Sequence, residues 1–292
     1  MQSGSWFIDN RHHLHRLDLA LVDLSGMPRR VVQDAIKSGG VKVNGQPQHH
    51  PGHRIREGVQ ITLTWIVSPL GDSPTLPPPI DIVFEDDWIM VINKPPGWLS
   101  HPVNGRNLAS VSEWAVGYHP AIQHVGHPHR PGIVHRLDQY TEGLMIVAKT
   151  PEALTACQAL FKSRQIQKTY WALVSGNVQS DTLDIHQPIL RSTKKRNRMV
   201  VHPDGKTAIS RLEVVTRYGS MTLVKMTPLT GRTHQIRVHL QFIGHPVVGD
   251  PLYGVNPHPH GQLLQAGGLS FIHPLTQEPL SFYLPLSNRL HR

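Results

Sequence analysis

The sequence predicts an α+β protein with two domains, a small α/β domain at the N-terminus and a larger domain that follows it. Helical and strand-like patterns occur along the whole chain of 292 residues, which is long enough to form two hydrophobic cores. Residues 69–79, PLGDSPTLPPP, contain five prolines and no periodic apolar pattern, which is typical of a semi-rigid spacer. We therefore predict domains at residues 11–67 and 80–292, joined by a proline-rich linker at 68–79.

The first 65 residues predict two helices followed by short strands. Leucines recur at helical spacing from residue 14 to residue 24, and Pro28 separates this helix from a second one, RRVVQDAIKSGG, which two glycines end. The segment VKVNGQ then alternates and turns at Asn44-Gly45, and alternation resumes from Val59 to Trp65. These elements define a compact module with basic residues around its turns: Arg29, Arg30, Lys37, Lys42, Arg54 and Arg56.

That layout resembles the small RNA-binding domain named after ribosomal small-subunit protein four, called here the S-four domain. The resemblance covers residues 14–65 and is carried by RRVVQDAIKSGGVKVNGQ, although Gly58-Val59 stands where the family has Gly-Asp before its last strand. The alternative is a solvated basic face on an ordinary small fold. The resemblance implies RNA contacts by Arg29, Arg30, Lys37 and Lys42.

The composition favours a folded protein whose partner is a polyphosphate. The net charge is +9 without counting 21 histidines, and basic domains of this kind most often bind nucleic acid, although basic composition can also serve solubility alone. No apolar run approaches the roughly 20 residues that span a bilayer, and the N-terminus lacks the apolar core of a secretory signal. Cys157 is the one cysteine, which excludes an intrachain disulfide and a CxxC zinc site. We expect a cytoplasmic protein without membrane contact, in which Cys157 is packed in the interior.

The tetrapeptide HRLD occurs twice, at residues 15–18 and at residues 135–138. Asp18 falls within the first leucine-patterned helix, where we interpret it as structural or as a local cap. Asp138 is the last residue of RPGIVHRLD, and a polar turn follows it. After the turn comes a continuous apolar run, LMIVAK, which predicts a buried strand. A carboxylate in that turn is either a turn cap or a positioned nucleophile, and the local pattern alone leaves both open.

Three more segments place polar residues at defined positions. WIMVINKPPG is an apolar strand that ends in a rigid loop, and QKTYWALVSG alternates, which places Tyr170 on one face of a strand. TGRTHQIRVHL predicts a turn and then a helix with Thr233 as its N-cap. In that helix His234, Arg237 and Gln241 form a polar strip between two apolar ones. We therefore expect Arg237 to point inward and to pair with an anion.

In this order, the segments resemble the RluA/RluD-type pseudouridine synthases from residue 80 to residue 285. The motifs that carry the resemblance are NKPPG at 93–97, RPGIVHRLD at 130–138, GLMIVAK at 143–149, KTYWALVSG at 168–176, GRTHQIRVHL at 231–240, HPVVGDPLYG at 245–254 and LSFIHPLTQEPL at 269–280. The resemblance implies a pseudouridine synthase fold, which is a mixed, largely antiparallel sheet with a catalytic cleft. It also implies isomerisation of uridine in RNA to pseudouridine, without a metal or an organic cofactor.

The resemblance also assigns roles to individual residues. By match to HRLD, Asp138 is the nucleophile, which attacks the sugar or carbon 6 of the base, and Arg237, by match to HQIR, keeps Asp138 ionised. Tyr170 stacks on the target base, and its hydroxyl can help proton transfer from carbon 5. Arg136 fills the space that the flipped base leaves. Further RNA contacts are expected from Lys94, His101, Arg232 and His234.

The expected partner is ribosomal RNA, within the large subunit or its precursor, and we expect a monomer. One departure from the family pattern follows Asp138, where Gln139 lacks the usual positive charge and Glu142 adds a negative one. This departure supports a non-catalytic RNA-binding or ribosome-assembly factor on the same fold as an alternative. A synthase that acts on transfer RNA also fits the motifs. A hydrolase that cleaves the glycosidic bond without re-forming it is a further candidate, although hydrolysis normally uses two carboxylates.

Two further segments are rich in basic or titratable residues. YHPAIQHVGHPHRPGIVH contains five histidines, but their spacing fits no zinc pattern, and we interpret the segment as a loop near RNA. RSTKKRNRMVVHPDGK carries five basic residues from 191 to 198. It predicts a charged hairpin or loop that contacts phosphate, with a solvated turn as the alternative.

Overall fold

The structure is a computed structural model that describes residues 2–27, 29–65, 79–103, 108–195 and 197–291, with the backbone alone for residues 2, 29–31 and 65. It divides into two compact units, Met1–Pro74 and Thr75–Arg292. The predicted linker at 68–79 falls almost wholly outside the described residues, as do the side chains of Arg29 and Arg30.

The N-terminal unit is a four-stranded antiparallel sheet with two helices. The strands lie in the order β1-β4-β2-β3. The elements, in chain order, are β1 (Gln2–Phe7), η1 (Asn10–His12), α1 (Leu17–Ser25), α2 (Arg29–Lys37), β2 (Val41–Val43), β3 (Gln46–Pro47) and β4 (Gln60–Trp65). The two helices and the strands were predicted from the sequence, except β1, which pairs with β4 along its whole length. The apolar core of the unit consists of Ile8, Leu17, Ala20, Leu21, Val32, Ile36, Val41, Ile55, Ile61 and Leu63.

The first HRLD has a structural role, as predicted. Asp18 is fully buried in the first turn of α1, and its carboxylate accepts from Arg16 Nε at 3.0 Å. Its other oxygen accepts from Gln33 Nε2 at 2.6 Å, so Asp18 joins α1 to α2. The predicted start of α1 at Leu14 is wrong, because Leu14 is 48% exposed and has a left-handed backbone with φ of 58°.

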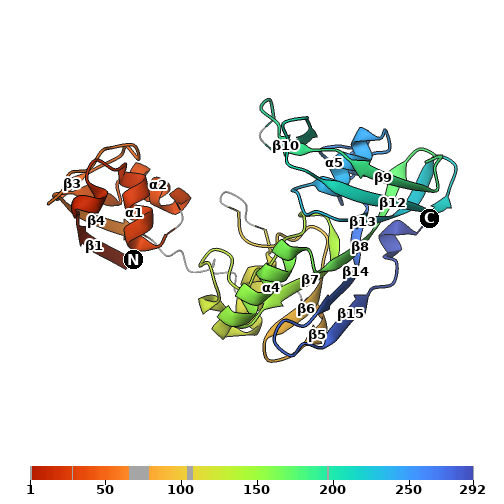
Figure 1. Cartoon of the computed structure of the whole chain (residues 1–292), viewed down its shortest axis with the longest axis horizontal. Helices are drawn as coiled ribbons and strands as arrows, with labels where there is room; N and C mark the ends of the chain where they lie inside the picture. Colours follow the sequence, from red (N-terminus) through yellow and green to blue (C-terminus); the bar gives the residue numbers. More distant parts are fainter. Residues whose placement is uncertain (1, 28, 66–78, 104–107, 196, 292) are drawn as a thin grey trace. The chain divides into compact units, whose positions relative to one another are not determined.

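The C-terminal unit is built on one mixed sheet. Its strands lie in the order β5-β6-β7-β14-β8-β13-β12-β9, and β15 also pairs with β14 (Figure 1). Only the β7–β14 pair is parallel among these described strands, so the expected mixed, largely antiparallel sheet is confirmed. The strands are β5 (Asp81–Glu85), β6 (Ile89–Lys94), β7 (Glu142–Ala148), β8 (Gln167–Ser175), β9 (Thr182–His186), β12 (Ile209–Arg217), β13 (Met221–Pro228), β14 (Leu264–Ile272) and β15 (Pro279–Tyr283).

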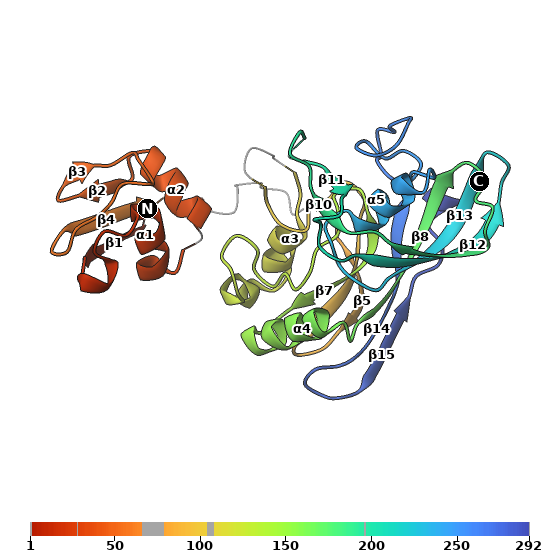
Figure 2. The same ribbon diagram turned by 45° about the horizontal axis from the view of Figure 1, so that its top comes forward.

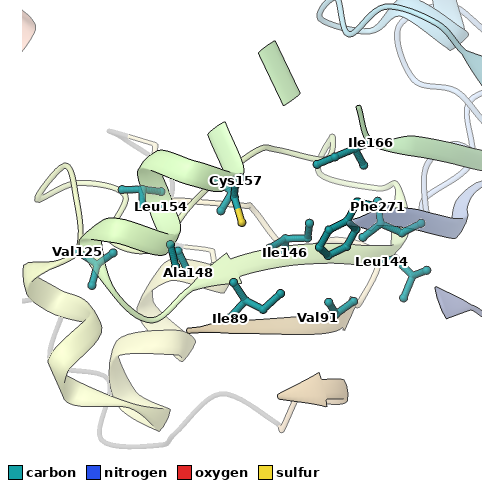
Figure 3. Close-up of a cluster of buried hydrophobic side chains, with 13 residues drawn as sticks. Ile89, Val91, Val125, Leu144, Ile146, Ala148, Leu154, Cys157, Ile166 and Phe271 are labelled. Atoms are coloured by element: carbon teal, nitrogen blue, oxygen red, sulfur yellow. The ribbon is translucent and has the colours of Figure 1, made fainter. Parts of the chain in front are cut away.

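The apolar runs of β6 and β7 are continuous because both faces of these strands are buried. Alternate residues of each strand enter two different cores, since successive side chains of a strand point to opposite faces. One core contains Ile89, Val91, Leu144, Ile146 and Ala148 together with Leu154 and Cys157 of α4 (Pro151–Ser163) (Figure 3). The other contains Met90, Ile92, Met145 and Val147 together with Val111, Trp114 and Ala115 of α3 (Val111–Tyr118). Cys157 is therefore packed, as expected, and burial raises the pKa of its thiol to about 12.

Gly143 allows the parallel contact between β7 and β14. Its φ is 114°, and a Cβ at this position would collide with the carbonyl oxygen of Ala266 on β14. Glycine is therefore required by both the backbone conformation and the approach of the neighbouring strand. The parallel pairing with β14 lies at the first two residues of β7, Glu142 and Gly143, close after the second HRLD.

The remaining described elements are one α-helix, two short 3₁₀ helices and one small hairpin. They are η2 (Pro120–His124), α5 (Gln235–Phe242), η3 (Asn288–Leu290) and the antiparallel hairpin of β10 (Ile189–Arg191) and β11 (Met199–Val201). Helix α5 lies beside β11 (Figure 2). The predicted hairpin in the basic segment is thus confirmed. None of the helices in the described ranges has the length and apolar character needed to cross a bilayer.

Candidate active site

A cleft of about 1280 Å³ opens beside the second HRLD. Residues Tyr170–Ser175 of β8 pair with β13, and this pairing ends at Met226 of β13. The next two residues of β13, Thr227 and Pro228, line the cleft, as does the start of β8. The cleft is therefore located where two neighbouring strands of the sheet separate. Its lining is strongly basic and includes Arg136, Lys162, Arg164, Lys168, Lys225 and Arg232.

The turn that carries Asp138 is held on both sides by the loop that follows β6. Ser100 Oγ accepts from the Leu137 N–H at 3.0 Å and donates to the Leu137 carbonyl at 2.9 Å. On the other side, the Gly97 N–H donates to the Gln139 carbonyl at 2.9 Å. The backbone immediately before and after Asp138 is therefore fixed, which restricts the positions open to its carboxylate.

Arg237 lies between two carboxylates and is 3% exposed. Its Nη1 donates to Asp138 Oδ2 at 2.6 Å, while its Nε and Nη2 donate to Asp250 Oδ2 and Oδ1 at 2.7 and 2.8 Å. Asp250 is fully buried, and its Oδ1 also accepts from the backbone N–H groups of Leu252 and Tyr253. The prediction that Arg237 points inward and pairs with an anion is confirmed, and the structure adds a second anion that was not predicted.

Asp138 is an ionised carboxylate in a largely buried place. Burial opposes its ionisation, but the charge and hydrogen bond of Arg237 outweigh burial and hold the pKa of Asp138 below its ordinary value. The Asp138 side chain is 18% exposed and lines the cleft, so its free oxygen is accessible. An immobilised anion that remains open to solvent on one side is suited to nucleophilic attack.

Tyr170 lies on β8 between two apolar cores and also lines the cleft. Burial raises the pKa of its hydroxyl, and the negative charge of Asp138 raises it further. Tyr170 is therefore a neutral phenol beside the ionised Asp138. A neutral aromatic ring in this position is suited to stacking on a planar base.

His234 is the third side chain close to Asp138. Its Nε2 lies 3.8 Å from Asp138 Oδ1, and its Nδ1 lies 2.8 Å from the hydroxyl of Tyr253. Burial lowers the pKa of His234 in spite of the two nearby carboxylates, so the imidazole is neutral at pH 7. The two oxygens of Asp138 thus have different neighbours, Arg237 at one and His234 at the other.

Six of the residues predicted for the site line one cleft, namely Arg136, Asp138, Tyr170, Arg232, His234 and Arg237. Arg136 is exposed there, whereas Arg232 is partly held by a hydrogen bond from its Nε to the Thr207 carbonyl at 3.0 Å. In the N-terminal unit, Lys37 and Lys42 are exposed, as an RNA contact requires. Arg29 and Arg30 were also predicted to contact RNA, but their side chains lie outside the described residues.

Lys94 and His101 do not line the cleft. Lys94 is fully buried, and its ammonium donates to the carbonyls of Pro95, Trp98 and Gln139 at 2.8, 2.9 and 3.0 Å. A lysine in such a cage cannot reach a phosphate, which corrects the expected role of Lys94. For His101, burial and then the positive charge of Arg136 lower the pKa to about 4, so it offers no positive charge to RNA at pH 7.

The predicted N-cap of α5 at Thr233 is also wrong. The helix begins at Gln235, and His234 is its N-cap residue with a left-handed backbone, φ 56°, and no side-chain cap. The turn is organised by the buried side chain of Gln235, whose Oε1 accepts from the Arg232 N–H at 2.9 Å and from Thr230 Oγ1 at 2.7 Å. The side chain of Gln235, and not that of Thr233, therefore accepts the backbone N–H in this turn.

The unusual residues after Asp138 are compensated by distant partners. Arg289 Nη1 lies 3.2 Å from Glu142 Oε1, so the additional negative charge is paired. Gln139 contributes its backbone carbonyl to the contacts with Lys94 and Gly97. Asp250, Tyr253, Ser100 and Arg289 were not predicted as site residues. Only Asp250 and Tyr253 had a signal in the sequence, since both belong to the motif HPVVGDPLYG.

A basic cleft around an immobilised, ionised carboxylate defines an enzyme that acts on nucleic acid. Within the described ranges, no group of three or more His, Cys, Asp or Glu side chains is arranged to hold a metal ion. The described cleft presents a carboxylate, a phenol, an imidazole and several guanidinium and ammonium groups.

Comparison with known proteins identifies the class of enzyme. The family model described as RNA pseudouridylate synthase matches residues 88–242, and the S4 domain model, which corresponds to the S-four domain, matches residues 15–61. The chain is 37% identical to the uncharacterized RNA pseudouridine synthase YlyB of Bacillus subtilis, over 88% of this chain and 86% of the relative. It is 36% identical to ribosomal large subunit pseudouridine synthase D of Pasteurella multocida, over 93% of this chain and 87% of the relative.

Solved structures agree with this result. The human protein RNA Pseudouridylate Synthase Domain Containing 1 superposes with a TM-score of 0.59 at 26% identity, over 71% of this chain and 83% of that protein. Human RNA Pseudouridylate Synthase Domain Containing 4 superposes with a TM-score of 0.56 at 25% identity, over 72% of this chain and 90% of that protein. The chain belongs to the RNA pseudouridylate synthase family. It is an RNA pseudouridine synthase with an N-terminal S4 domain, as the sequence motifs implied.

Proposed function

We propose that this synthase isomerises one or more uridines of large-subunit ribosomal RNA, with Asp138 as the nucleophile. The substrate is supported by relatives named ribosomal large subunit pseudouridine synthase D, among them that of Escherichia coli K12, at 34% identity over 93% of this chain. The role of Asp138 rests on one observation. Its carboxylate is bound by Arg237 at 2.6 Å at the edge of a basic cleft.

Asp138 attacks either the anomeric carbon of the sugar or carbon 6 of the base. In both routes the bond between the sugar and N1 breaks, the base turns, a bond forms between the sugar and carbon 5, and the bond to Asp138 breaks to restore its carboxylate. Carbon 5 loses its proton and N1 gains one, so the product is an isomer of the substrate. The lowered pKa of Asp138 supplies the anion that the first step needs at pH 7. Because the same base is released and reattached, the reaction requires no second substrate.

Tyr170 stacks on the base during this turn, and its hydroxyl stays protonated. The raised pKa of Tyr170 favours stacking over a role as a phenolate base for the carbon 5 proton. The base must first leave its helix, which costs a few kcal/mol. Arg136 is exposed at the cleft two residues before Asp138, and it fills the vacated position in the RNA.

The remaining basic residues hold the RNA backbone. In the cleft these are Arg232 and its basic neighbours Lys162, Arg164, Lys168 and Lys225. In the S4 domain they are Lys37, Lys42, Arg29 and Arg30. Contacts of this kind fix the position of the enzyme on RNA without reading sequence, and the local RNA shape selects the uridine.

The test is pseudouridine mapping on an unmodified large-subunit ribosomal RNA transcript, with wild type beside Asp138→Asn. We expect new pseudouridine with the wild type alone and unchanged RNA binding by both proteins. Pseudouridine formed by Asp138→Asn would overturn the role of the nucleophile. A transfer RNA pool and assembled large subunits are assayed in parallel, and modification of transfer RNA alone would overturn the proposed substrate.

A binding factor without catalytic activity is the second candidate, and it is not favoured. Its support was the charge change after Asp138, and the ion pair between Glu142 and Arg289 compensates that change.

We further propose that the protein acts as a cytoplasmic monomer. A chain with one cysteine suits a reducing compartment. Light scattering in solution tests the monomer, and cell fractionation tests the compartment.

A further inference from the structure

Tyr253 is a buried residue that contacts both Arg237 and His234, the two side chains beside the oxygens of Asp138. It is 2% exposed, and it follows Asp250 in the loop after α5. Its ring centroid lies 5.0 Å from the guanidinium carbon of Arg237, and its backbone N–H donates to Asp250 Oδ1 at 3.0 Å. Its hydroxyl lies 2.8 Å from His234 Nδ1. One side chain thus contacts both groups that flank the two oxygens of Asp138.

The hydrogen bonds of the Tyr253 hydroxyl favour one position for the proton of His234. The hydroxyl accepts from the Met199 N–H at 2.8 Å, because a backbone N–H can only donate. The single proton of the hydroxyl is then free to be donated to His234 Nδ1. With the hydroxyl as donor, Nδ1 of the neutral imidazole accepts and Nε2 carries the proton of His234.

That Nε2–H group faces the oxygen of Asp138 that Arg237 leaves free. The distance from Nε2 to Asp138 Oδ1 is 3.8 Å, which is too long for a hydrogen bond in this state. Hydrogen bonds in active sites are often long without substrate and shorten in the complex. His234 also has a left-handed backbone, with φ of 56°, which a residue with a side chain adopts only where its surroundings hold it.

We propose that Tyr253 is a positioning residue for this reaction, because it holds His234 with its Nε2–H directed at Asp138 Oδ1. The inference rests on the proposed role of Asp138 as nucleophile. The titratable and charged groups that face His234 are Asp138, Arg237, Asp250, Arg136 and Tyr253 itself. The neutral state of His234 agrees with this arrangement, since a protonated imidazole could not accept from Tyr253.

The same hydroxyl connects the active site to the basic hairpin. Met199 is the first residue of β11, and the guanidinium carbon of its neighbour Arg198 lies 5.0 Å from the Tyr253 ring centroid. The hairpin also carries Lys194 and Lys195, which are exposed. The residue that holds His234 is thus itself held in part by the hairpin.

The test uses Tyr253→Phe, which removes the hydroxyl and keeps the ring and both guanidinium contacts. The substrate is the large-subunit transcript tritiated at carbon 5 of uracil, and release of tritium gives the single-turnover rate constant. We expect Tyr253→Phe to lower this rate constant by about 10- to 100-fold, the effect of a misplaced reacting group. The dissociation constant for RNA should stay unchanged. The matched control is Tyr118→Phe, which removes an exposed hydroxyl bonded to Glu85 Oε2 at 2.9 Å on another part of the unit.

A double-mutant cycle with His234 separates this role from simple stabilisation. His234→Gln keeps an N–H donor at a similar position, so it should retain more activity than His234→Ala. In the His234→Ala background, Tyr253→Phe should cost nothing further. A wild-type rate constant in Tyr253→Phe, or the same loss in the His234→Ala background, would overturn the proposal. So would equal activity of the two His234 variants, a comparison that holds even if Tyr253→Phe folds poorly.

Asp138→Asn in the same assay distinguishes the failure of this inference from failure of the proposed function. Loss of tritium release in Asp138→Asn establishes the nucleophile, and the Tyr253 and His234 variants are then judged on their own results. Tritium release retained in Asp138→Asn would overturn the role of Asp138, and the inference with it.

Discussion

Asp250 binds the guanidinium of Arg237 through two parallel hydrogen bonds, 2.7 and 2.8 Å long, and leaves the Nη1 of Arg237 free for Asp138. This bidentate arrangement fixes the plane of the guanidinium. The position of the proposed nucleophile is thus set by a carboxylate that does not itself reach the described cleft lining.

Asp250→Asn should reduce both stability and activity. The substitution removes the buried negative charge that balances Arg237, and breaking a buried ion pair costs about 3 to 5 kcal/mol. Denaturant unfolding measures the loss of stability, and single-turnover kinetics measure the loss of activity. The control is Asp184→Asn, which breaks an exposed pair with Arg211 and should change neither quantity measurably. Wild-type activity in Asp250→Asn would contradict the positioning role of this pair.

Arg237→Met should move the acid side of the pH–rate profile to higher pH. In the wild type Arg237 holds the pKa of Asp138 below its ordinary value, so Asp138 stays ionised at neutral and mildly acidic pH. Without the guanidinium, burial is opposed only by His234 and Arg136, so the pKa of Asp138 rises and its protonation moves toward the measurable range. Arg237→Lys, which keeps a positive charge, should shift the profile less.

The same lowered pKa has a consequence for stability. Because the folded pKa of Asp138 is depressed, its stabilising contribution is present above the unfolded pKa and is lost as pH falls through the folded pKa. The free energy of unfolding of wild type and Asp138→Asn should therefore converge at acid pH. A difference that stays constant from neutral to acid pH would show that Arg237 does not lower this pKa.

Arg289→Gln should impair the enzyme, and Glu142→Gln should restore it. The single change leaves the Glu142 carboxylate, 12% exposed, without its partner and adds a net negative charge near the site. We expect kcat/KM to fall several-fold, with the double variant close to wild type. The measurement is a double-mutant cycle on kcat/KM for the large-subunit transcript. Additive effects of the two substitutions would exclude a functional ion pair.

Gly143→Ala should destabilise the C-terminal unit by about 2 to 3 kcal/mol, near the upper end for single substitutions. The added methyl group meets the Ala266 carbonyl, and the backbone has a φ of 114°. Gly219→Ala is the matched control, since Gly219 also has a positive φ but open space around its Cβ position. It should cost about 1 kcal/mol, the ordinary penalty of a left-handed backbone. Equal losses in the two variants would mean that the contact with β14 adds nothing.

The strands and helices that could be predicted are those whose pattern is strong within a short window. β6 and β7 are continuous apolar runs because two cores share their side chains, and α2 lies between a proline and two glycines. β1 could not be predicted, because QSGSWF has few apolar residues and its partner β4 follows more than fifty positions later. The start of α1 was placed too early, since Leu14 fits the leucine spacing but belongs to the preceding turn.

The site residues divide in the same way. Asp138, Tyr170 and Arg237 are found through motifs, and the inward orientation of Arg237 follows from the polar strip on its helix. The partner of an ion pair is not encoded locally, because Asp138 and Arg237 are 99 positions apart and Glu142 and Arg289 are 147 apart. Lys94 was misjudged for a related reason. Whether a lysine is exposed or enclosed by carbonyls depends on how two loops pack together.

The pairing of Arg237 with two carboxylates also determines what happens to buried charge during the reaction. Once Asp138 has formed a covalent bond to the sugar or to the base, as the proposed mechanism requires, its carboxylate is an ester and no longer an anion. Arg237 is then still neutralised by Asp250, which stays bound through two hydrogen bonds. The intermediate therefore loses the attraction between Arg237 and Asp138, but it leaves no unbalanced cation in the interior, because Asp250 remains charged beside Arg237.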